Sequence, residues 1–213
     1  MLRPHVLARA VDQIVRQSRN QPVDRRLLQM LRFGWGNESF SADLDYLERV
    51  AESAAQVEGA ILECGSGVTT LLLGLLAGRH KQNIYVLEHE PEWFAIVRAA
   101  LSTYHIEGVR LCLVPLRDYG DFTWYQPNLE LSPETFSLVV CDGPPESTPG
   151  GRYGLVPVMR KYLNSQCTIL VDDANTVRGS QILARWQAEW SASVTVIQST
   201  AGDFAEVRIG HAC

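Results

Sequence analysis

Short apolar runs alternate with longer amphipathic segments from about residue 60 to the end of the chain. The runs are rich in Val, Ile and Leu and are bounded by Gly, Pro or acidic residues, which is typical of strands buried on both faces of a sheet. The segments between them carry apolar residues at helical spacing. The expected strands are 60–63, 84–88, 109–114, 136–141, 168–171, 193–197 and 204–209, and the expected helices are 68–78, 91–104, 154–163 and 177–190.

Strands that alternate with helices form parallel sheets covered by helices on both faces. The last two runs, 193–197 and 204–209, are joined by a short polar connection, so we expect them to pair as an antiparallel hairpin. The sequence therefore predicts an α/β fold: a Rossmann-like, seven-stranded, mostly parallel sheet with helices on both faces and a C-terminal antiparallel hairpin.

The first 57 residues have a different pattern. Helical spacing of apolar residues runs over 6–32 with a break at Pro22, and resumes over 44–54 after a segment, 33–39, that we expect to be an irregular loop. We predict an N-terminal helical cap (1–57) on a Rossmann-like core (58–213). Together they form a single domain (1–213) that is large enough to bury a hydrophobic core. The cap helices could serve as a lid or as the interface of a homo-oligomer.

Composition and charge exclude some classes of partner but do not identify the function. The chain has 213 residues, a formal charge of -5 and no basic run, which argues against nucleic acids and anionic membranes as partners. The five cysteines are odd in number and form no C-x-x-C pair, so we expect reduced thiols. The N-terminal segment lacks the apolar core of a signal peptide, and no apolar stretch is long enough to span a membrane. We expect a cytoplasmic protein.

Four expected strands end on carboxylates, at Glu63, Glu88, Asp142 and the pair Asp172-Asp173. The carboxyl ends of parallel strands lie along one edge of the sheet, where ligands of open α/β sheets bind. A row of carboxylates at that edge favours a cationic ligand, a metal ion or sugar hydroxyls.

Glu63 is followed by a glycine-rich turn that leads into a helix. Gly65 and Gly67 allow a sharp bend and a close backbone approach, and Ser66 offers a donor. The match to a dinucleotide fingerprint is incomplete because Thr70 stands where that motif has its third glycine. An acid before the glycines suits an ammonium group better than a pyrophosphate, which favours S-adenosylmethionine over NAD.

Glu88 lies 25 residues after Glu63, at the end of the next strand. An acid at this place can accept hydrogen bonds from both hydroxyls of a ribose. His89 follows directly and is a candidate cofactor contact, with an exposed loop histidine as the alternative.

Three segments together resemble successive motifs of the class I S-adenosylmethionine-dependent methyltransferases. The subgroup they look like is a set of small bacterial enzymes distantly similar to the catechol and caffeoyl-CoA O-methyltransferases, and the resemblance extends from about residue 34 to the C-terminus. It is carried by residues 61–67 (ILECGSG), 86–93 (VLEHEPEW) and 141–145 (CDGPP). Residues 35–38 (WGNE) and 124–125 (WY) also look like that subgroup.

The resemblance implies roles for individual residues. Glu63 would lie near the methionine end of the cofactor, Glu88 would hold the ribose, and Asn37 would approach from the N-terminal side. The backbone from Gly65 to Gly67 would face the cofactor, and Asp142 would lie at the reacting end, as a cofactor contact and the candidate catalytic residue.

The resemblance also implies a divalent-metal site, with Mg²⁺ as the natural ion. Asp142, Asp172 and Asp173 occupy the positions of the two aspartates and one asparagine that bind the metal in the catechol-type enzymes. This chain departs from them in having Asp173 for the asparagine and in lacking their lysine close after the first aspartate, where it has Gly143-Pro144-Pro145. The alternative is that Asp172 or Asp173 caps the following turn.

Two further groups stand outside these motifs. The aromatic residues of the long connection 115–133, Trp124 and Tyr125 among them, could wall a substrate pocket or pack the loop onto the sheet. Arg152 could meet an anionic substrate or be exposed to solvent.

The leading interpretation is an enzyme that transfers a methyl group from S-adenosylmethionine to an oxygen or nitrogen of a small molecule. The alternatives are an NAD(P)-dependent oxidoreductase, which would leave Glu63 and the Asp172-Asp173 pair without a role, and a non-catalytic binding module that retains the fold.

Overall fold

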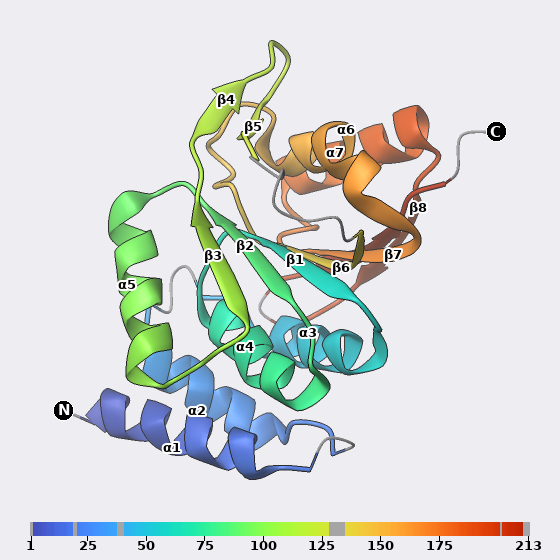
Figure 1. Cartoon of the computed structure of the whole chain (residues 1–213). Coiled ribbons are helices and arrows are strands. Elements are labelled where there is room, and N and C mark those ends of the chain that lie inside the picture. Colours follow the sequence, from blue (N-terminus) through green and yellow to red (C-terminus); the bar gives the residue numbers. More distant parts are fainter. Residues whose placement is uncertain (1, 19–20, 38–40, 128–134, 201, 211–213) are drawn as a thin grey trace.

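The computed structural model describes residues 2–18, 21–37, 41–127, 135–200 and 202–210, and in these it forms a central sheet of seven strands. The strand order is β3-β2-β1-β6-β7-β9-β8, and β9 is antiparallel to both of its neighbours while β1, β2, β3, β6 and β7 are parallel (Figure 1). The predicted mostly parallel sheet and C-terminal hairpin are confirmed. The strands are β1 (Ala60–Cys64), β2 (Ile84–Glu88), β3 (Val109–Leu113), β6 (Phe136–Cys141), β7 (Leu163–Val171), β8 (Ser193–Ile197) and β9 (Phe204–Arg208).

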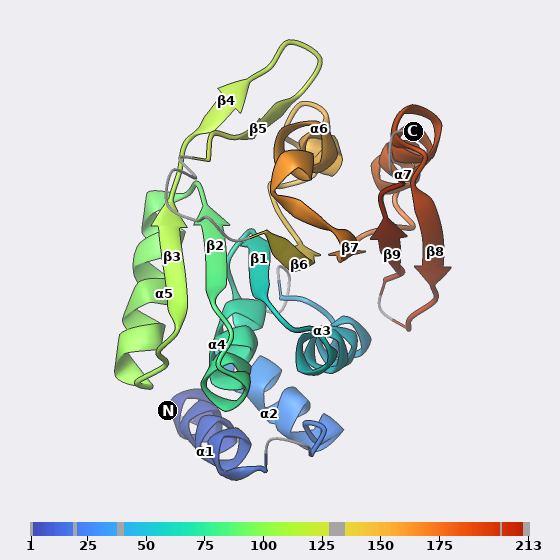
Figure 2. The same ribbon diagram turned by 45° about the vertical axis from the view of Figure 1, so that its right-hand side comes forward.

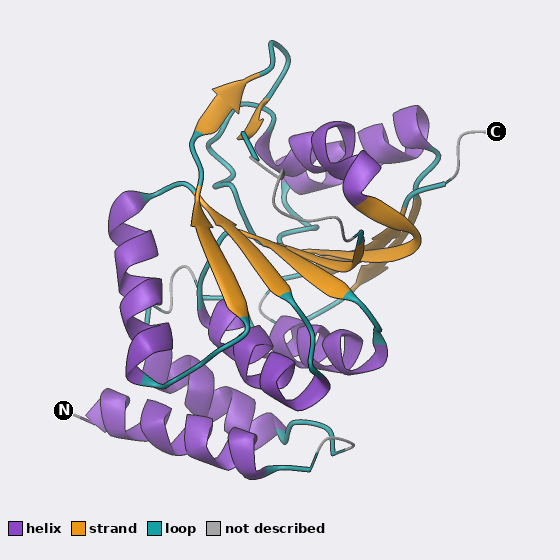
Figure 3. Cartoon of the chain, viewed as in Figure 1, coloured by secondary structure: helices purple, strands orange, loops and turns teal. Residues whose placement is uncertain are grey.

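Helices cover both faces of this sheet (Figure 3). One face carries α3 (Leu44–Gln56), α4 (Val68–His80) and α5 (Pro91–Thr103), and the other carries α6 (Leu155–Met159) and α7 (Val177–Trp190). The remaining helices, α1 (Leu2–Arg16) and α2 (Arg25–Trp35), pack together outside α4 and form an additional layer.

Alternation along the strands divides the buried residues between two cores. In β1, Ile61 belongs to the core under α3 and α4, whereas Leu62 and Cys64 belong to the core under α6 and α7. Because successive side chains of a strand point to opposite faces, Glu63 shares the α4 side with Ile61. This parity decides where the first candidate acid lies.

The expected loop over 33–39 is wrong at its start, because α2 continues through Gly34, ends at Trp35 and is capped by Gly36, which has φ +80°. Residues 38–39 of this expected loop lie outside the described residues. A β-carbon at Gly34 would lie 2.6 Å from the backbone nitrogen of Leu7. The glycine therefore serves the close crossing of α1 and α2 rather than a turn.

The connection after β3 is also more ordered than expected. Its described part, up to residue 127, contains an antiparallel hairpin of β4 (Leu116–Asp118) and β5 (Thr123–Tyr125), and Trp124 and Tyr125 are fully buried. Residues 128–133 of the expected connection lie outside the described residues. Figure 2 shows this hairpin rising beyond the edge of the sheet where β1 and β2 end. Of the two interpretations of these rings, packing against the protein is the one observed.

The predicted helix over 154–163 is broken into short turns. A 3-10 turn η1 (Gly151–Gly154) precedes α6, a second one, η2 (Arg160–Tyr162), follows it, and β7 begins at Leu163 rather than at 168. The early part of β7 is polar and partly exposed, so hydrophobic patterning does not reveal it.

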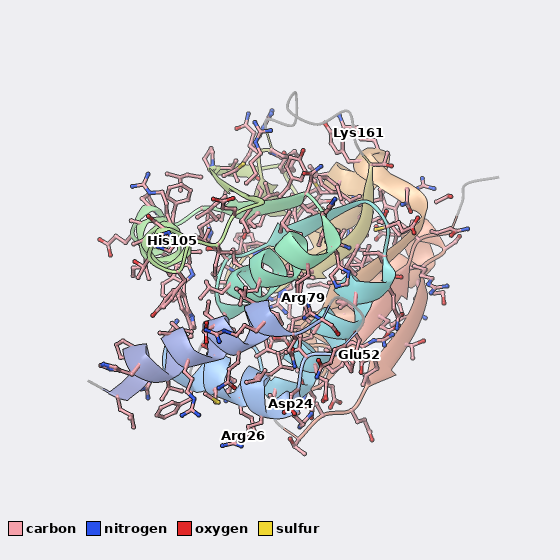
Figure 4. All side chains as sticks on the ribbon, turned by 60° about the horizontal axis from the view of Figure 1, so that its bottom comes forward. Asp24, Arg26, Glu52, Arg79, His105 and Lys161 are labelled. Atoms are coloured by element: carbon pink, nitrogen blue, oxygen red, sulfur yellow. The ribbon has the colours of Figure 1, made fainter. Side chains whose placement is uncertain are left out.

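The side of the molecule remote from the β4–β5 hairpin is formed by the N-terminal helices α1 and α2 (Figure 4). Asp24 caps α2 by accepting from the backbone nitrogen of Arg26 at 2.7 Å, and Arg79 of α4 donates to the carbonyl oxygens of Ser18 and Gln21. The Arg79 hydrogen bonds fasten the connection between α1 and α2 to α4. Over the stretches that the structure describes, no helix is both long and apolar enough to cross a membrane.

Candidate functional site

The glycine turn after β1 meets the turn after β6 at the carboxyl edge of the sheet. Gly65 has φ +85°, and a β-carbon there would lie 2.8 Å from the backbone nitrogen of Gly143. Gly67 is extended, with φ 177°, and an added β-carbon would meet no described atom within 4 Å. The two backbones therefore cross in contact at Gly65, while open space adjoins Gly67 at the start of α4.

Glu63 is buried against the first turn of α4. Its side chain is 0 % exposed and accepts hydrogen bonds from the hydroxyls of Thr69 and Thr70, the latter at 2.7 Å. Burial raises the pKa of Glu63 to about 8, although the two threonine hydrogen bonds act in the opposite direction. Glu63 therefore packs against the first turn of α4. Its contact with a cofactor stays a prediction.

Glu88 accepts hydrogen bonds from two turns at the carboxyl edge of the sheet. Its Oε2 accepts from the backbone nitrogen of Ser66 at 3.0 Å and from the Ser66 hydroxyl at 2.6 Å, and its Oε1 accepts from the backbone nitrogens of His89 and Glu90 at 2.7 and 2.9 Å. Burial alone would raise the pKa of Glu88, but hydrogen bonds from His89, Glu90 and Ser66 lower it to about 2. A charged carboxylate therefore joins the β1–α4 turn to the β2–α5 turn.

Aromatic rings surround this junction. His89 has Nδ1 3.3 Å from Glu88 Oε1, and its ring meets the edge of the Tyr125 ring at 5.9 Å between centroids. Trp93 donates to the carbonyl oxygen of Ser66 at 2.6 Å and packs edge to face against Trp35.

Asn37 follows that stack two residues after Trp35. It is exposed and has φ +56°. Its predicted approach to the cofactor remains a prediction.

The three aspartates predicted to hold a metal lie around the guanidinium of Arg152. Nη2 of Arg152 is 2.7 Å from Asp173 Oδ2, 3.0 Å from Asp142 Oδ1 and 2.8 Å from the Asp142 carbonyl oxygen, while Nη1 donates to the carbonyl oxygen of Asp172. Arg152 is 7 % exposed. It is thus neither a solvent-exposed residue nor an open anion receptor, the two roles expected for it.

Burial raises the pKa values of Asp142 and Asp172; repulsion from Asp173 adds to this in both, and the charge of Arg152 opposes it. Arg152 stays protonated. Its burial lowers its pKa, but the attraction of the same carboxylates outweighs this effect and raises the pKa. Within the described ranges, no group of three His, Cys, Asp or Glu side chains is arranged to hold a metal ion. The donor set does not fit the predicted Mg²⁺ site.

Tyr125 belongs to the aromatic connection that was expected either to wall a substrate pocket or to pack onto the sheet, and no chemical role was predicted for its hydroxyl. Its ring is 0 % exposed, its hydroxyl finds no hydrogen-bond partner in the described part of the chain, and a β-carbon at Gly143 would lie 2.6 Å from that hydroxyl. The sequence offered only an aromatic loop, and the register of β4 with β5 is what carries Tyr125 to the glycine crossing.

Comparisons with known proteins give a consistent answer at the level of the fold. No model of a known protein family matches this sequence, and no curated protein matches it. Three solved structures illustrate the structural similarity. A methyltransferase of Podospora anserina with S-adenosylhomocysteine bound has a TM-score of 0.66 at 17 % identity, covering 95 % of this chain and 94 % of that one.

The other two are an O-methyltransferase of Bacillus cereus in complex with S-adenosylhomocysteine and a putative caffeoyl-CoA O-methyltransferase of Staphylococcus aureus. The first has a TM-score of 0.61 at 12 % identity and covers 95 % of this chain and 91 % of that one. The second has a TM-score of 0.65 at 11 % identity and covers 86 % of this chain and 92 % of that one. The chain has the fold of the S-adenosylmethionine-dependent methyltransferases.

Proposed function

We propose that this protein transfers a methyl group from S-adenosylmethionine to an oxygen or nitrogen of a small molecule. The observation that carries the proposal is the junction of the β1–α4 turn with Glu88 beside the open space at Gly67, in a fold that solved methyltransferases share.

The residues present fit this cofactor. Glu88 is a buried anion at the end of β2, and a ribose hydroxyl could replace the Ser66 hydroxyl on its Oε2. Gly67 leaves room for a ligand at the amino end of α4. The aspartates at the neighbouring strand ends give the crevice a negative potential that suits a cation.

When bound, S-adenosylmethionine supplies an electrophilic methyl group on a positively charged sulfur. The protein's own part is alignment and exclusion of water. We assign Asp142 to the reacting end, as the sequence resemblance implies. In support, its side chain is 27 % exposed and its Oδ1 is held by Arg152. Its proposed role is to orient the acceptor and accept its proton.

Glu88→Gln is expected to weaken binding of S-adenosylhomocysteine by about 10- to 100-fold, because a hydrogen bond to a charged group contributes about 1.5–3 kcal/mol. Isothermal calorimetry of the full chain measures this directly. Glu90→Gln is the matched control, since the Glu90 side chain is exposed and only its backbone nitrogen touches Glu88.

The same titration with NADH separates the proposal from an oxidoreductase. Micromolar binding of NADH without binding of S-adenosylhomocysteine or S-adenosylmethionine would overturn the proposal. Equal affinities of wild type and Glu88→Gln for S-adenosylhomocysteine would remove Glu88 from the cofactor site.

A further inference from the structure

Arg152 enters the acidic edge from a rigid turn on the α7 side of the sheet. Two glycines with positive φ, Gly150 and Gly151, begin the turn, and the Gly151 nitrogen donates to the carbonyl oxygen of Thr148 at 2.8 Å. The next carbonyl oxygen, that of Tyr153, accepts from the indole of Trp186 at 3.0 Å. The backbone on both sides of Arg152 is therefore fixed.

The guanidinium ties two loops that follow different strands. Through Nη2 it contacts Asp142 after β6 and Asp173 after β7, and through Nη1 it reaches the carbonyl oxygen of Asp172. Asp173 has φ +57°, and its Oδ2 lies 2.7 Å from Nη2 of Arg152. One side chain thus bridges the segments that a shared metal ion would bridge.

The space between these oxygens is the space a metal would need. Mg²⁺ requires oxygen ligands at about 2.0–2.1 Å in an octahedron, whereas a guanidinium nitrogen already lies 2.7 Å from one carboxylate and 3.0 Å from the other. Arginine is always charged and has a planar set of donors suited to carboxylates.

From this arrangement we infer that Arg152 takes the place of a divalent ion and holds Asp142 at the reacting end of the site, so that the protein works without a metal. The inference rests on the proposed methyl transfer for what Asp142 does. It makes Arg152 a positioning residue that acts through Asp142.

Replacement of the ion by Arg152 restricts the chemical class of the methyl acceptor. A metal would lower the pKa of an acceptor hydroxyl bound to it, and a guanidinium bound to carboxylates does not coordinate an acceptor oxygen. The acceptor is therefore a nucleophile that becomes reactive when the carboxylate of Asp142 accepts its proton. It is not a hydroxyl that needs a metal ion for its activation.

Thermal unfolding of the full chain with MgCl₂, MnCl₂ or EDTA tests the inference, with calorimetric titration of Mn²⁺ as a second readout. Wild type is expected to show no response to any of them. Arg152→Met removes the charge and uncovers the carboxylates, and we expect this variant to gain a saturable Mn²⁺ response of about 3–6 °C at tenfold excess over its Kd. A merely structural arginine would lower stability without creating a metal site.

Arg178→Met is the matched control, because Arg178 lies nearby and donates to the carbonyl oxygens of Glu146 and Thr148 rather than to the aspartates. Adding Asp173→Ala to Arg152→Met removes one of the three side-chain ligands and should abolish the gained response. Stabilisation of wild type by Mg²⁺ or Mn²⁺, or a folded Arg152→Met without a metal response, would overturn the inference.

If Arg152→Met does not fold, the wild-type titration decides alone: a metal response overturns the inference and its absence supports it. Binding of S-adenosylhomocysteine to wild type is measured separately. A wild type that binds neither that ligand nor a metal would refute the proposed function and leave the replacement of the ion by Arg152 intact.

Discussion

Glu63→Gln should abolish a loss of stability that the wild-type protein suffers as pH rises from about 4.5 to about 8. The pKa of Glu63 is raised from 4.5 to about 8, so between these values the folded state holds a proton that the unfolded state has released. Stability that is fully present below the unfolded pKa is then lost up to the folded pKa, at about 1.4 kcal/mol per pH unit. The upper limit is about 4–5 kcal/mol. A glutamine does not titrate and imitates the protonated acid.

Urea unfolding of both proteins at several pH values from 5 to 8 measures the effect. Carboxyl groups remote from Glu63 titrate equally in wild type and variant, so the difference in the free energy of unfolding reports on Glu63 and on the two acids that interact with it, Asp142 and Glu88. Glu58→Gln, which changes an exposed acid close to the start of β1, should leave the pH dependence unchanged. Parallel pH profiles for wild type and Glu63→Gln would show that Glu63 is charged in the folded protein.

The same variant separates two roles for Glu63. A protonated acid facing Thr69 and Thr70 does not attract an ammonium group, so a structural Glu63 predicts that Glu63→Gln binds S-adenosylhomocysteine as wild type does. Loss of binding in a folded Glu63→Gln would favour the role implied by the sequence resemblance.

Hydrophobic patterning was sufficient for the sheet because alternation and helical spacing are local properties. It also placed Glu88 and Asp142 at one edge, since parallel strands bring their carboxyl ends together. It could not settle the direction of Glu63, which depends on which face of β1 receives α4.

The largest gap in the sequence-based interpretation concerned the three aspartates, because sequence did not reveal that Arg152 lies among them. Arg152 follows Asp142 by ten residues and precedes Asp173 by 21, and nothing in its neighbourhood signals a buried guanidinium. Its position depends on two positive φ values and on packing against α7. A sequence motif identifies residues at strand ends but not the side chain that a distant turn delivers to them.

The two glycines of the β1–α4 turn should behave differently when each is replaced by alanine. Gly65→Ala is expected to cost about 3 kcal/mol in the free energy of unfolding, since φ +85° is unfavourable for an L-residue and the new β-carbon would lie 2.8 Å from the Gly143 nitrogen. Gly67→Ala should cost less than about 1 kcal/mol, because its backbone is extended and its surroundings are open.

Cofactor binding should show the opposite dependence on the two glycines. If the open space beside Gly67 receives the cofactor, a methyl group placed there meets the ligand and not the protein, so Gly67→Ala should remain folded and bind S-adenosylhomocysteine at least about tenfold more weakly. Urea unfolding and calorimetry on the two variants give all four values. Unchanged affinity in Gly67→Ala would place the cofactor elsewhere along the strand edge, and an undiminished stability in Gly65→Ala would mean that the turns after β1 and β6 do not cross in contact.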